Sequence, residues 1–363
     1  MRADPDAALL LRSVLDEGHY REVQALLREP SAERPFVEPF SGERVRAAIE
    51  GLPELGQLLV RLFTLGATVP LDAVQAELDG SVVDRLAEIG LLERVRDGVR
   101  SRFIVTAYAN RLLAVSPPLW LRGYEPGELL VDMSATAYWM ARFVTNRGPA
   151  RRALEVGTGS GLLVTLLDAA EAVAVEGDPG TAEVAAFNVL LNGLDGRVEV
   201  RTGSLFEPVA DELFDLIVAN PPCLPAPEGV ALPWPSDGGA DGDAVLRQVL
   251  SGLGAHLEFG GEALVGGQGF GNEREPFIAG WLREALAGTA LGATFLVGDA
   301  QSVESAGETL RQRWQETGVE EEQAFAAWTR FCADTRPDRH YTYVVKLAPG
   351  GDGTVAVHPL LSA

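Results

Sequence analysis

Residues 153–161, with the sequence ALEVGTGSG, constrain the fold of this chain more than any other segment. A short apolar run leads into Gly157, Gly159 and Gly161, and residues 162–167 have the composition of a helix start. Glycine has no Cβ and accepts a positive φ, so this order of strand, turn and helix lets the backbone approach a nucleotide-like ligand closely. The segment therefore predicts an α/β domain with a ligand site at the turn.

The glycine spacing distinguishes between two kinds of ligand. The dinucleotide-binding fingerprint reads G-x-G-x-x-G, whereas this chain reads E-x-G-x-G-x-G with Glu155 before the first glycine. A carboxylate at that point would repel a pyrophosphate. It suits a ligand that carries an amino group and a sulfonium.

Three further apolar segments end in polar residues or glycine, as expected of parallel strands that share one functional edge. Residues 172–175 lead into Glu176, about twenty residues after the glycines, where an acidic side chain can bind both ribose hydroxyls. Residues 198–200 lead into the segment 203–206, and residues 214–219 lead into Asn220, Pro221, Pro222 and Cys223.

This order of landmarks resembles the class I S-adenosylmethionine (SAM) methyltransferases, and the NPP segment resembles the members that methylate planar nitrogens. Residues 237–243 (DGGADGD) and 257–269 (LEFGGEALVGGQG) are similar to the release-factor glutamine methyltransferases in particular. The resemblance covers roughly residues 129–269. It implies an α/β fold with a doubly wound, mostly parallel seven-stranded sheet, and SAM as the cofactor.

The resemblance also implies a role for each landmark. Glu155 would lie near the methionine ammonium group and organise the glycine loop, and Glu176 would bind the ribose hydroxyls. The Asn220 side-chain oxygen and the Pro221 carbonyl would accept both N–H bonds of a planar amide or amine, which favours the tetrahedral transition state. The implied cofactor-binding residues are Glu155, Gly157, Thr158, Gly159, Gly161, Glu176, Gly177, Asp178, Ser204, Leu205 and Asn220. The implied catalytic residues are Asn220, Pro221, Pro222 and Cys223, and no metal site is expected.

Two positions depart from the family pattern. Ser204 stands where the family usually has an aspartate that accepts a hydrogen bond from the adenine amino group, and serine accepts more weakly. Cys223 stands where a tyrosine or phenylalanine stacks on the planar substrate. Ser204 therefore bears on the affinity for SAM, whereas Cys223 weakens the case for a flat nucleobase or a standard glutamine loop and leaves room for a smaller or differently shaped acceptor.

The N-terminal part of the chain has the pattern of a winged helix over residues 55–106. The pattern predicts a helix over residues 81–91 in the recognition position, with Ser81 as its N-cap. It also predicts a hairpin turn at Asp97-Gly98, with residues 102–105 completing the wing. We therefore expect a helical and winged-helix-like domain for substrate or partner recognition over residues 1–115, and the methyltransferase domain over residues 116–363.

The distribution of charge bears on the partner. The net charge is −22, and residues 116–363 hold 16 basic against 34 acidic residues. Nucleic-acid affinity comes largely from positive charge, so we expect a protein, peptide or small-molecule acceptor. The alternatives are an rRNA or DNA base N-methyltransferase docked by the arginine-bearing wing, a small-molecule O-methyltransferase, and a SAM-binding regulator without activity.

The remaining features carry weaker expectations. The two cysteines fit a reducing cytoplasm, and no signal peptide or membrane span is expected. Residues 224–243 would wall the substrate pocket, by family resemblance. The helices expected over residues 304–316 and 322–333 look like an insertion between the last strands, either a lid or, as we favour, a solvated surface. The sequence does not predict an oligomeric state.

Overall fold

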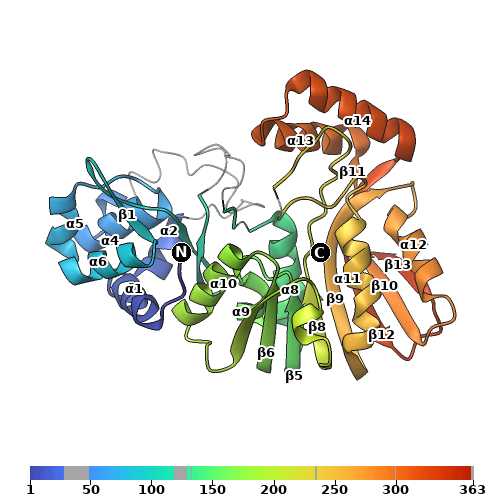
Figure 1. The fold of residues 1–363 in the computed structure, drawn as a ribbon, viewed down its shortest axis with the longest axis horizontal. Coiled ribbons are helices and arrows are strands. Elements are labelled where there is room, and N and C mark those ends of the chain that lie inside the picture. Colours follow the sequence, from blue (N-terminus) through green and yellow to red (C-terminus); the bar gives the residue numbers. More distant parts are fainter. Residues whose placement is uncertain (28–48, 118–128, 132, 234, 299, 361–363) are drawn as a thin grey trace.

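The structure is a computed structural model that describes residues 1–27, 49–117, 129–131, 133–233, 235–298 and 300–360. Figure 1 shows a helical N-terminal region (blue) beside a twisted sheet with helices on both faces, and a helical hairpin (red) above the C-terminal half of the sheet. The proline- and charge-rich residues 29–39 and Trp234 in the loop after Cys223 lie outside the described residues.

The N-terminal region contains five α-helices, a π-helical turn and two β-hairpins among the described residues. Its elements are α1 (Pro5–Glu17), α2 (Tyr20–Leu27), α4 (Glu54–Leu59), η1 (Val60–Thr64), α5 (Leu71–Glu77), α6 (Gly80–Glu88), β1 (Leu92–Val95), β2 (Gly98–Ser101), β3 (Ile104–Tyr108) and β4 (Arg111–Val115). Antiparallel pairing joins β1 to β2 and β3 to β4. The winged-helix interpretation of this region stays a prediction.

Two local expectations in this region are wrong. The N-cap of α6 is Asp79, whose carboxylate accepts from the Ser81 backbone N–H at 2.8 Å. The second strand of the first hairpin starts at Gly98, because the register pairs Val95 with Gly98. A Cβ at Gly98 would lie 2.0 Å from the Val69 carbonyl oxygen, so the close approach of another backbone segment requires glycine in the strand itself.

The N-terminal region packs directly on α10 (Pro179–Leu191) of the sheet domain, and its apolar core continues into Val184, Phe187 and Leu191. The Asn188 amide donates to the Ala114 carbonyl at 2.9 Å and accepts from the Ala114 N–H at 2.7 Å. The Asn192 side-chain amide likewise donates to the Leu112 carbonyl and accepts from the Leu112 N–H. Two side-chain amides thus satisfy the open edge of β4, where an unpaired buried backbone would be costly.

The large sheet has the strand order β13-β10-β12-β9-β8-β5-β6-β7. Its strands are β5 (Ala150–Val156), β6 (Ala169–Glu176), β7 (Val198–Thr202), β8 (Phe214–Ala219), β9 (Leu257–Gly271), β10 (Leu291–Val297), β11 (Gln301–Ser302), β12 (Arg339–Pro349) and β13 (Val355–Pro359). The five strands β5 to β9 are mutually parallel, and β12 is antiparallel to both its neighbours.

The predicted fold class is confirmed, with a larger sheet than expected. The described part of the sheet has nine strands where seven were predicted, because β13 adds to the edge beside β10 and the short β11 pairs with β12. The Thr354 carbonyl accepts from the Ala293 N–H at 3.0 Å, which starts the β13 pairing. The order of the other seven, with the antiparallel β12 between β9 and β10, is doubly wound about β5.

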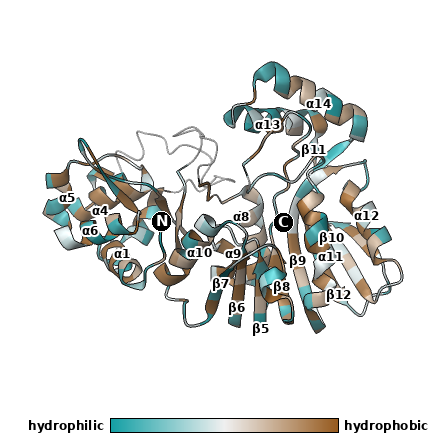
Figure 2. Ribbon diagram, in the orientation of Figure 1, coloured by the Kyte–Doolittle hydropathy of each residue, from teal (hydrophilic) through white to brown (hydrophobic). Residues whose placement is uncertain are grey.

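Helices cover both faces of the sheet. They are α8 (Ala135–Asn146), α9 (Leu162–Leu166) and α10 on one face, and α11 (Ala244–His256) and α12 (Phe277–Leu286) on the other. Alternate strand residues serve the two cores: Ile217 of β8 points to the α11 side and Leu216 to the α8 side. Burial on both faces explains why the strands are nearly continuous apolar runs, and the central strands are coloured as more hydrophobic than α13 and α14 in Figure 2.

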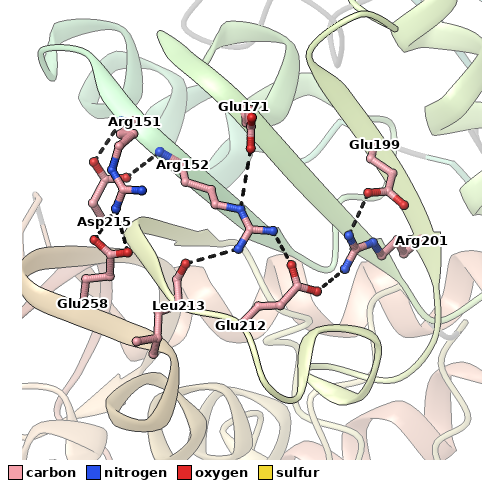
Figure 3. A network of polar contacts seen from close by, with 9 residues as sticks. All are labelled: Arg151, Arg152, Glu171, Glu199, Arg201, Glu212, Leu213, Asp215 and Glu258. Atoms are coloured by element: carbon pink, nitrogen blue, oxygen red, sulfur yellow. Dashed lines mark hydrogen bonds and ion pairs between the residues drawn. The ribbon is translucent and has the colours of Figure 1, made fainter.

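A charged network joins the strands near the edge where the parallel strands begin, opposite the glycine loop (Figure 3). The Arg152 guanidinium pairs with Glu212, lies 3.8 Å from Glu171 and sits over the Phe214 ring at 4.7 Å. Asp215 accepts the backbone N–H groups of Arg151 and Arg152 at 2.8 Å each. These contacts tie β5, β6 and β8 together and leave the other edge free for chemistry.

The last helices form a hairpin, α13 (Val303–Glu316) and α14 (Glu321–Thr335), inserted between β11 and β12. It lies over the loop that follows β8 (Figure 1). Among the described residues, no helix is both long enough and apolar enough to cross a membrane.

Candidate active site

The glycine loop after β5 has the backbone that its sequence predicts. Gly157, Gly159 and Gly161 have φ values of 73°, 56° and 78°, a region that side chains disfavour. At Gly157 and Gly159 no atom lies within 4 Å of the position a Cβ would take. The loop is therefore open toward a cavity, and its shape leaves room for a ligand against the backbone.

Glu155 at the end of β5 is buried, and its carboxylate binds groups in and after the glycine loop. Its carboxylate accepts from the Thr158 hydroxyl at 2.6 Å and from the Val164 backbone N–H at 2.8 Å. Burial, with a smaller contribution from the nearby Glu176, raises the pKa of Glu155 to about 8. A buried carboxyl group of this kind favours a cationic partner, which would restore its ionised form.

Glu176 at the end of β6 is also buried and fixed by backbone donors. Its two carboxylate oxygens accept from the Gly159 N–H at 2.9 Å and the Asp178 N–H at 3.0 Å. Burial raises the pKa of Glu176. Each oxygen keeps further lone pairs for a ligand hydroxyl, whereas the Asp178 side chain caps α10 by accepting from the Thr181 N–H at 2.7 Å.

A cavity of about 350 Å³ opens above these groups. Of the residues predicted to contact the cofactor, its lining includes Glu155, Gly157, Thr158, Gly159, Glu176, Gly177, Ser204, Leu205 and Asn220, together with Pro221 and Pro222. Gly161 and Asp178 are outside the lining. The open glycine cradle, the buried acid at its base and the second acid at the next strand end fit a ligand with an ammonium group, a ribose and an adenine, as SAM has.

The far wall of this cavity follows β7. Leu205 has a φ of 48°, a left-handed conformation that is strained for a leucine. The Ser204 carbonyl accepts from the Glu207 N–H at 2.9 Å, which closes the turn. Both residues line the cavity, so the strain occurs at a turn in the cavity wall.

Asn220, at the end of β8, is oriented by a residue that sequence reasoning missed. Its side-chain N–H₂ donates to the Ser134 hydroxyl at 3.2 Å, and the same hydroxyl accepts from the Ala137 N–H at 3.1 Å as the N-cap of α8. A Cβ at Gly266 would lie 3.3 Å from the Asn220 Oδ1. The amide oxygen therefore has a fixed direction, and glycine at position 266 leaves space for it.

A second cavity, of about 510 Å³, adjoins the first. The two cavities share a boundary made of Leu130, Ser134, Asn220, Pro221, Pro222, Pro235 and Ser236. The second cavity extends to Cys223, Gln268 and His340, and to one face of α13. A donor bound in the first cavity and an acceptor bound in the second can thus meet at this boundary, of which the NPP segment is part.

Cys223 faces the second cavity and is tightly packed at its backbone. A Cβ at Gly238 would lie 2.9 Å from the Cys223 Cα, and one at Gly242 would lie 2.7 Å from the Cys223 carbonyl oxygen. The glycines of the DGGADGD segment are thus required where that loop rests on the end of β8. Burial raises the pKa of the Cys223 thiol to about 11, so the group stays protonated at neutral pH and is a poor nucleophile.

No group of three or more potential metal ligands occurs in the part of the chain that the structure describes. The strand order, the glycine loop and the two adjoining cavities define a class I SAM-dependent methyltransferase.

Comparisons with known proteins give the family. Residues 136–221 match the family model of the ribosomal protein L11 methyltransferases, and residues 41–102 match a family described only as a domain of unknown function. The chain is 40% identical over 186 residues to a ribosomal protein uL3 glutamine methyltransferase of Bradyrhizobium diazoefficiens, which covers 46% of this chain and 58% of that protein.

A second relative is matched over more of its length. The chain is 30% identical to the ribosomal protein uL3 glutamine methyltransferase of Bordetella pertussis, over 61% of this chain and 76% of that protein. A solved ribosomal protein L11 methylase from Lactobacillus delbrueckii subsp. bulgaricus is 18% identical over 64% of this chain and 92% of that one, with a TM-score of 0.34. The chain belongs to the family of the protein glutamine methyltransferases, and the resemblance found in its motifs is confirmed.

Proposed function

We propose that this chain transfers a methyl group from SAM to the side-chain amide nitrogen of a glutamine residue in a protein. The observation that carries the proposal is the boundary of Asn220, Pro221 and Pro222 shared by the two cavities. The names of the relatives, which are glutamine methyltransferases of uL3, agree with it.

SAM supplies an electrophilic methyl group on a positively charged sulfur. In this chain Glu155 would hold the ammonium group and Glu176 the ribose hydroxyls. The backbone at Gly177 and the turn at Ser204 and Leu205 would contact the adenine. All five residues line the first cavity, so one ligand could bind them together.

The NPP segment orients the acceptor nitrogen. Asn220 Oδ1 and the Pro221 carbonyl oxygen are hydrogen-bond acceptors, and the two prolines after Asn220 have no backbone N–H to compete for them. If both accept from one amide N–H₂ group, the nitrogen lone pair is turned away from them and toward the donor cavity. Ser134 holds the Asn220 amide by its nitrogen, at 3.2 Å, so its oxygen is already aimed before the acceptor binds, which is preorganisation of the kind that lowers a barrier.

The acceptor cavity suits a neutral amide better than a cationic amine. Burial lowers the pKa of His340 to about 4, so this ring is neutral at physiological pH. The one carboxylate among the described lining residues, Glu316, pairs with Arg313 at 3.0 Å. Among the described lining residues a lysine ammonium group would find no unpaired carboxylate, and His340 with its lowered pKa is only a weak base, whereas an amide needs neither.

The charge of the N-terminal region favours protein recognition over nucleic acid. Two of the wing arginines are already paired, Arg94 with Asp84 and Arg100 with Glu93. The wing therefore offers less free positive charge than its sequence suggests, and phosphate contacts need that charge. Residues 1–115 form the recognition domain in this proposal, and the enzyme acts in the cytoplasm on a protein acceptor.

The test is to incubate the enzyme and methyl-labelled SAM with purified uL3, release factors, total RNA and a small-molecule fraction. We expect label in a protein, and fragmentation by mass spectrometry should place the methyl on a glutamine side-chain nitrogen. Replacing that glutamine by glutamate in the acceptor should abolish labelling. Label in RNA, or on a carboxylate or hydroxyl oxygen, would overturn the proposal.

A further inference from the structure

The α13–α14 hairpin is fastened to the loop that walls the acceptor cavity. The buried Trp314 indole N–H donates to the Pro225 carbonyl at 3.0 Å, and the Thr317 hydroxyl lies 3.4 Å from the Ala231 carbonyl oxygen. Gln323 and Arg330 of α14 donate to the carbonyls of Gly229 and Glu228. Four side chains thus hold backbone groups of one short segment.

An apolar core joins the same parts. Phe270 at the end of β9 packs with Leu310, Trp314 and Phe331 of the hairpin, and Leu224, Val230 and Leu232 of the loop pack against them. A Cβ at Gly307 would lie 2.5 Å from the Trp328 ring, so the two helices approach closely there. The hairpin and the loop therefore form one unit, and the hairpin is more than a solvated surface.

One face of α13 lines the acceptor cavity. The lining residues are Ala306, Thr309, Leu310, Arg313, Glu316 and Thr317, which follow the three- and four-residue spacing of a single helix face. Leu310 is buried and serves both the core and the cavity wall. The face of α13 and the NPP segment therefore line the same cavity.

Two polar groups on this face are matched to a peptide backbone. The Thr309 hydroxyl donates to the Ser305 carbonyl at 3.2 Å, which leaves the lone pairs of its oxygen for an N–H donor. Arg313 donates from one guanidinium nitrogen, Nη1, to the Glu316 carboxylate at 3.0 Å. The other N–H groups of the guanidinium remain for a carbonyl. An acceptor and a donor one helical turn apart can bind the N–H and C=O of one extended segment.

We propose that α13 is the polypeptide-binding wall of the acceptor site, and that Thr309 and Arg313 bind the main chain of the segment that carries the methylated glutamine. This inference rests on the proposed function. It assigns the recognition of residues next to the glutamine to the inserted hairpin, and it leaves the N-terminal region to bind more distant parts of the same protein.

The test compares Thr309→Val and Arg313→Ala with two matched controls, Thr329→Val and Arg311→Ala. The controls change the same residue types on the same hairpin at positions outside the cavity lining. Each cavity variant should raise KM for the protein acceptor about three- to tenfold, as the loss of one hydrogen bond implies, and the double variant should raise it further. The values of kcat, of KM for SAM and of Tm should stay near those of the wild type, and both controls should behave as the wild type.

Two negative results are distinguishable. If the wild type methylates a glutamine but both cavity variants keep its KM for the acceptor, or both controls raise KM equally, the role of α13 is refuted and the proposed function stands. If the wild type transfers no methyl to protein, both fail. A dissociation constant for the unreacted acceptor protein, measured with S-adenosylhomocysteine present, gives a readout of binding that does not depend on turnover.

Discussion

SAM binding to this enzyme is expected to strengthen by nearly tenfold per pH unit between about pH 5.5 and 7.5, because Glu155 must lose a proton to pair with the ligand ammonium group. In the structure the Glu155 carboxylate is buried and accepts two hydrogen bonds, from Thr158 and Val164. Those donors are neutral, so they compensate the charge only in part. Burial outweighs them and raises the pKa of Glu155 to about 8.

The size of the effect follows from that value. At pH 7 about one enzyme molecule in eleven would hold an ionised Glu155 before SAM binds, and the apparent affinity is reduced by that fraction. The reduction is about tenfold, or about 1.4 kcal/mol, and about 0.9 proton is released for each SAM bound at pH 7. The sign is fixed: the folded-state pKa is raised, so a ligand that needs the anion binds more weakly as the pH falls below 8.

Calorimetry in two buffers of different ionisation enthalpy measures the released protons directly. The wild type should give different binding enthalpies in the two buffers at pH 7, and the difference should correspond to about 0.9 proton. Glu155→Gln should bind SAM more weakly, with the same enthalpy in both buffers and little dependence on pH. Equal enthalpies and a flat pH profile for the wild type would refute the reasoning and leave Glu155 only its structural role.

Other substitutions and conditions test separate parts of the site. Asn220→Ala is expected to lower kcat by about 10²–10³ while the Kd for SAM from calorimetry changes little; an active variant would remove Asn220 from the acceptor site. Glu176→Ala should weaken SAM binding by about 1–3 kcal/mol, and an unchanged Kd would contradict its contact with the ribose. Burial raises the pKa of Asp243 to about 7. Asp243 therefore loses its proton at a lower pH in the unfolded state than in the folded state, and the free energy of unfolding falls as the pH rises through about 4 to 7. Asp243→Asn should accordingly raise Tm more at about pH 8 than at about pH 4, and equal changes would speak against this titration. The full chain should give no mobility shift with duplex DNA at physiological salt; a shift whose salt dependence implies several phosphate contacts would restore the nucleic-acid alternative.

The sequence was sufficient to predict which residues lie at the strand ends and line the first cavity. Glu155, Glu176 and Asn220 each follow an apolar run, and parallel strands bring their carboxyl ends to one edge of a sheet. The glycines at positions 157 and 159 could also be explained from the sequence, because their positive φ is disfavoured for other residues. These rules depend only on neighbouring residues. The fold class and the position of the first cavity could therefore be predicted without knowing any distant contact.

Long-range contacts could not be predicted in this way. Ser134 and Asn220 lie 86 residues apart, and nothing in either segment indicates that one orients the other. The nine-strand sheet depends on the pairing of β13 with β10, which only the tertiary structure determines. The first hairpin turn was misplaced because Gly98, part of a strong turn signal, is needed for its close approach to Val69. The packing of α13 on the loop after β8 was not predicted, because its spacing is also that of an ordinary solvated helix.

Cys223 and α13 are best explained together. An aromatic side chain at position 223 would occupy part of the acceptor cavity and stack on a planar group, whereas Cys223 leaves that space open. The opposite wall is supplied by Thr309 and Leu310 of α13, and Trp314 fixes this helix to the Pro225 carbonyl, two residues after Cys223. Because the same segment links the reacting edge to the helix, a displacement of α13 would displace the wall beside the acceptor nitrogen. In the proposed function α13 therefore provides a wall of the acceptor cavity that a ring at position 223 does not provide in this chain.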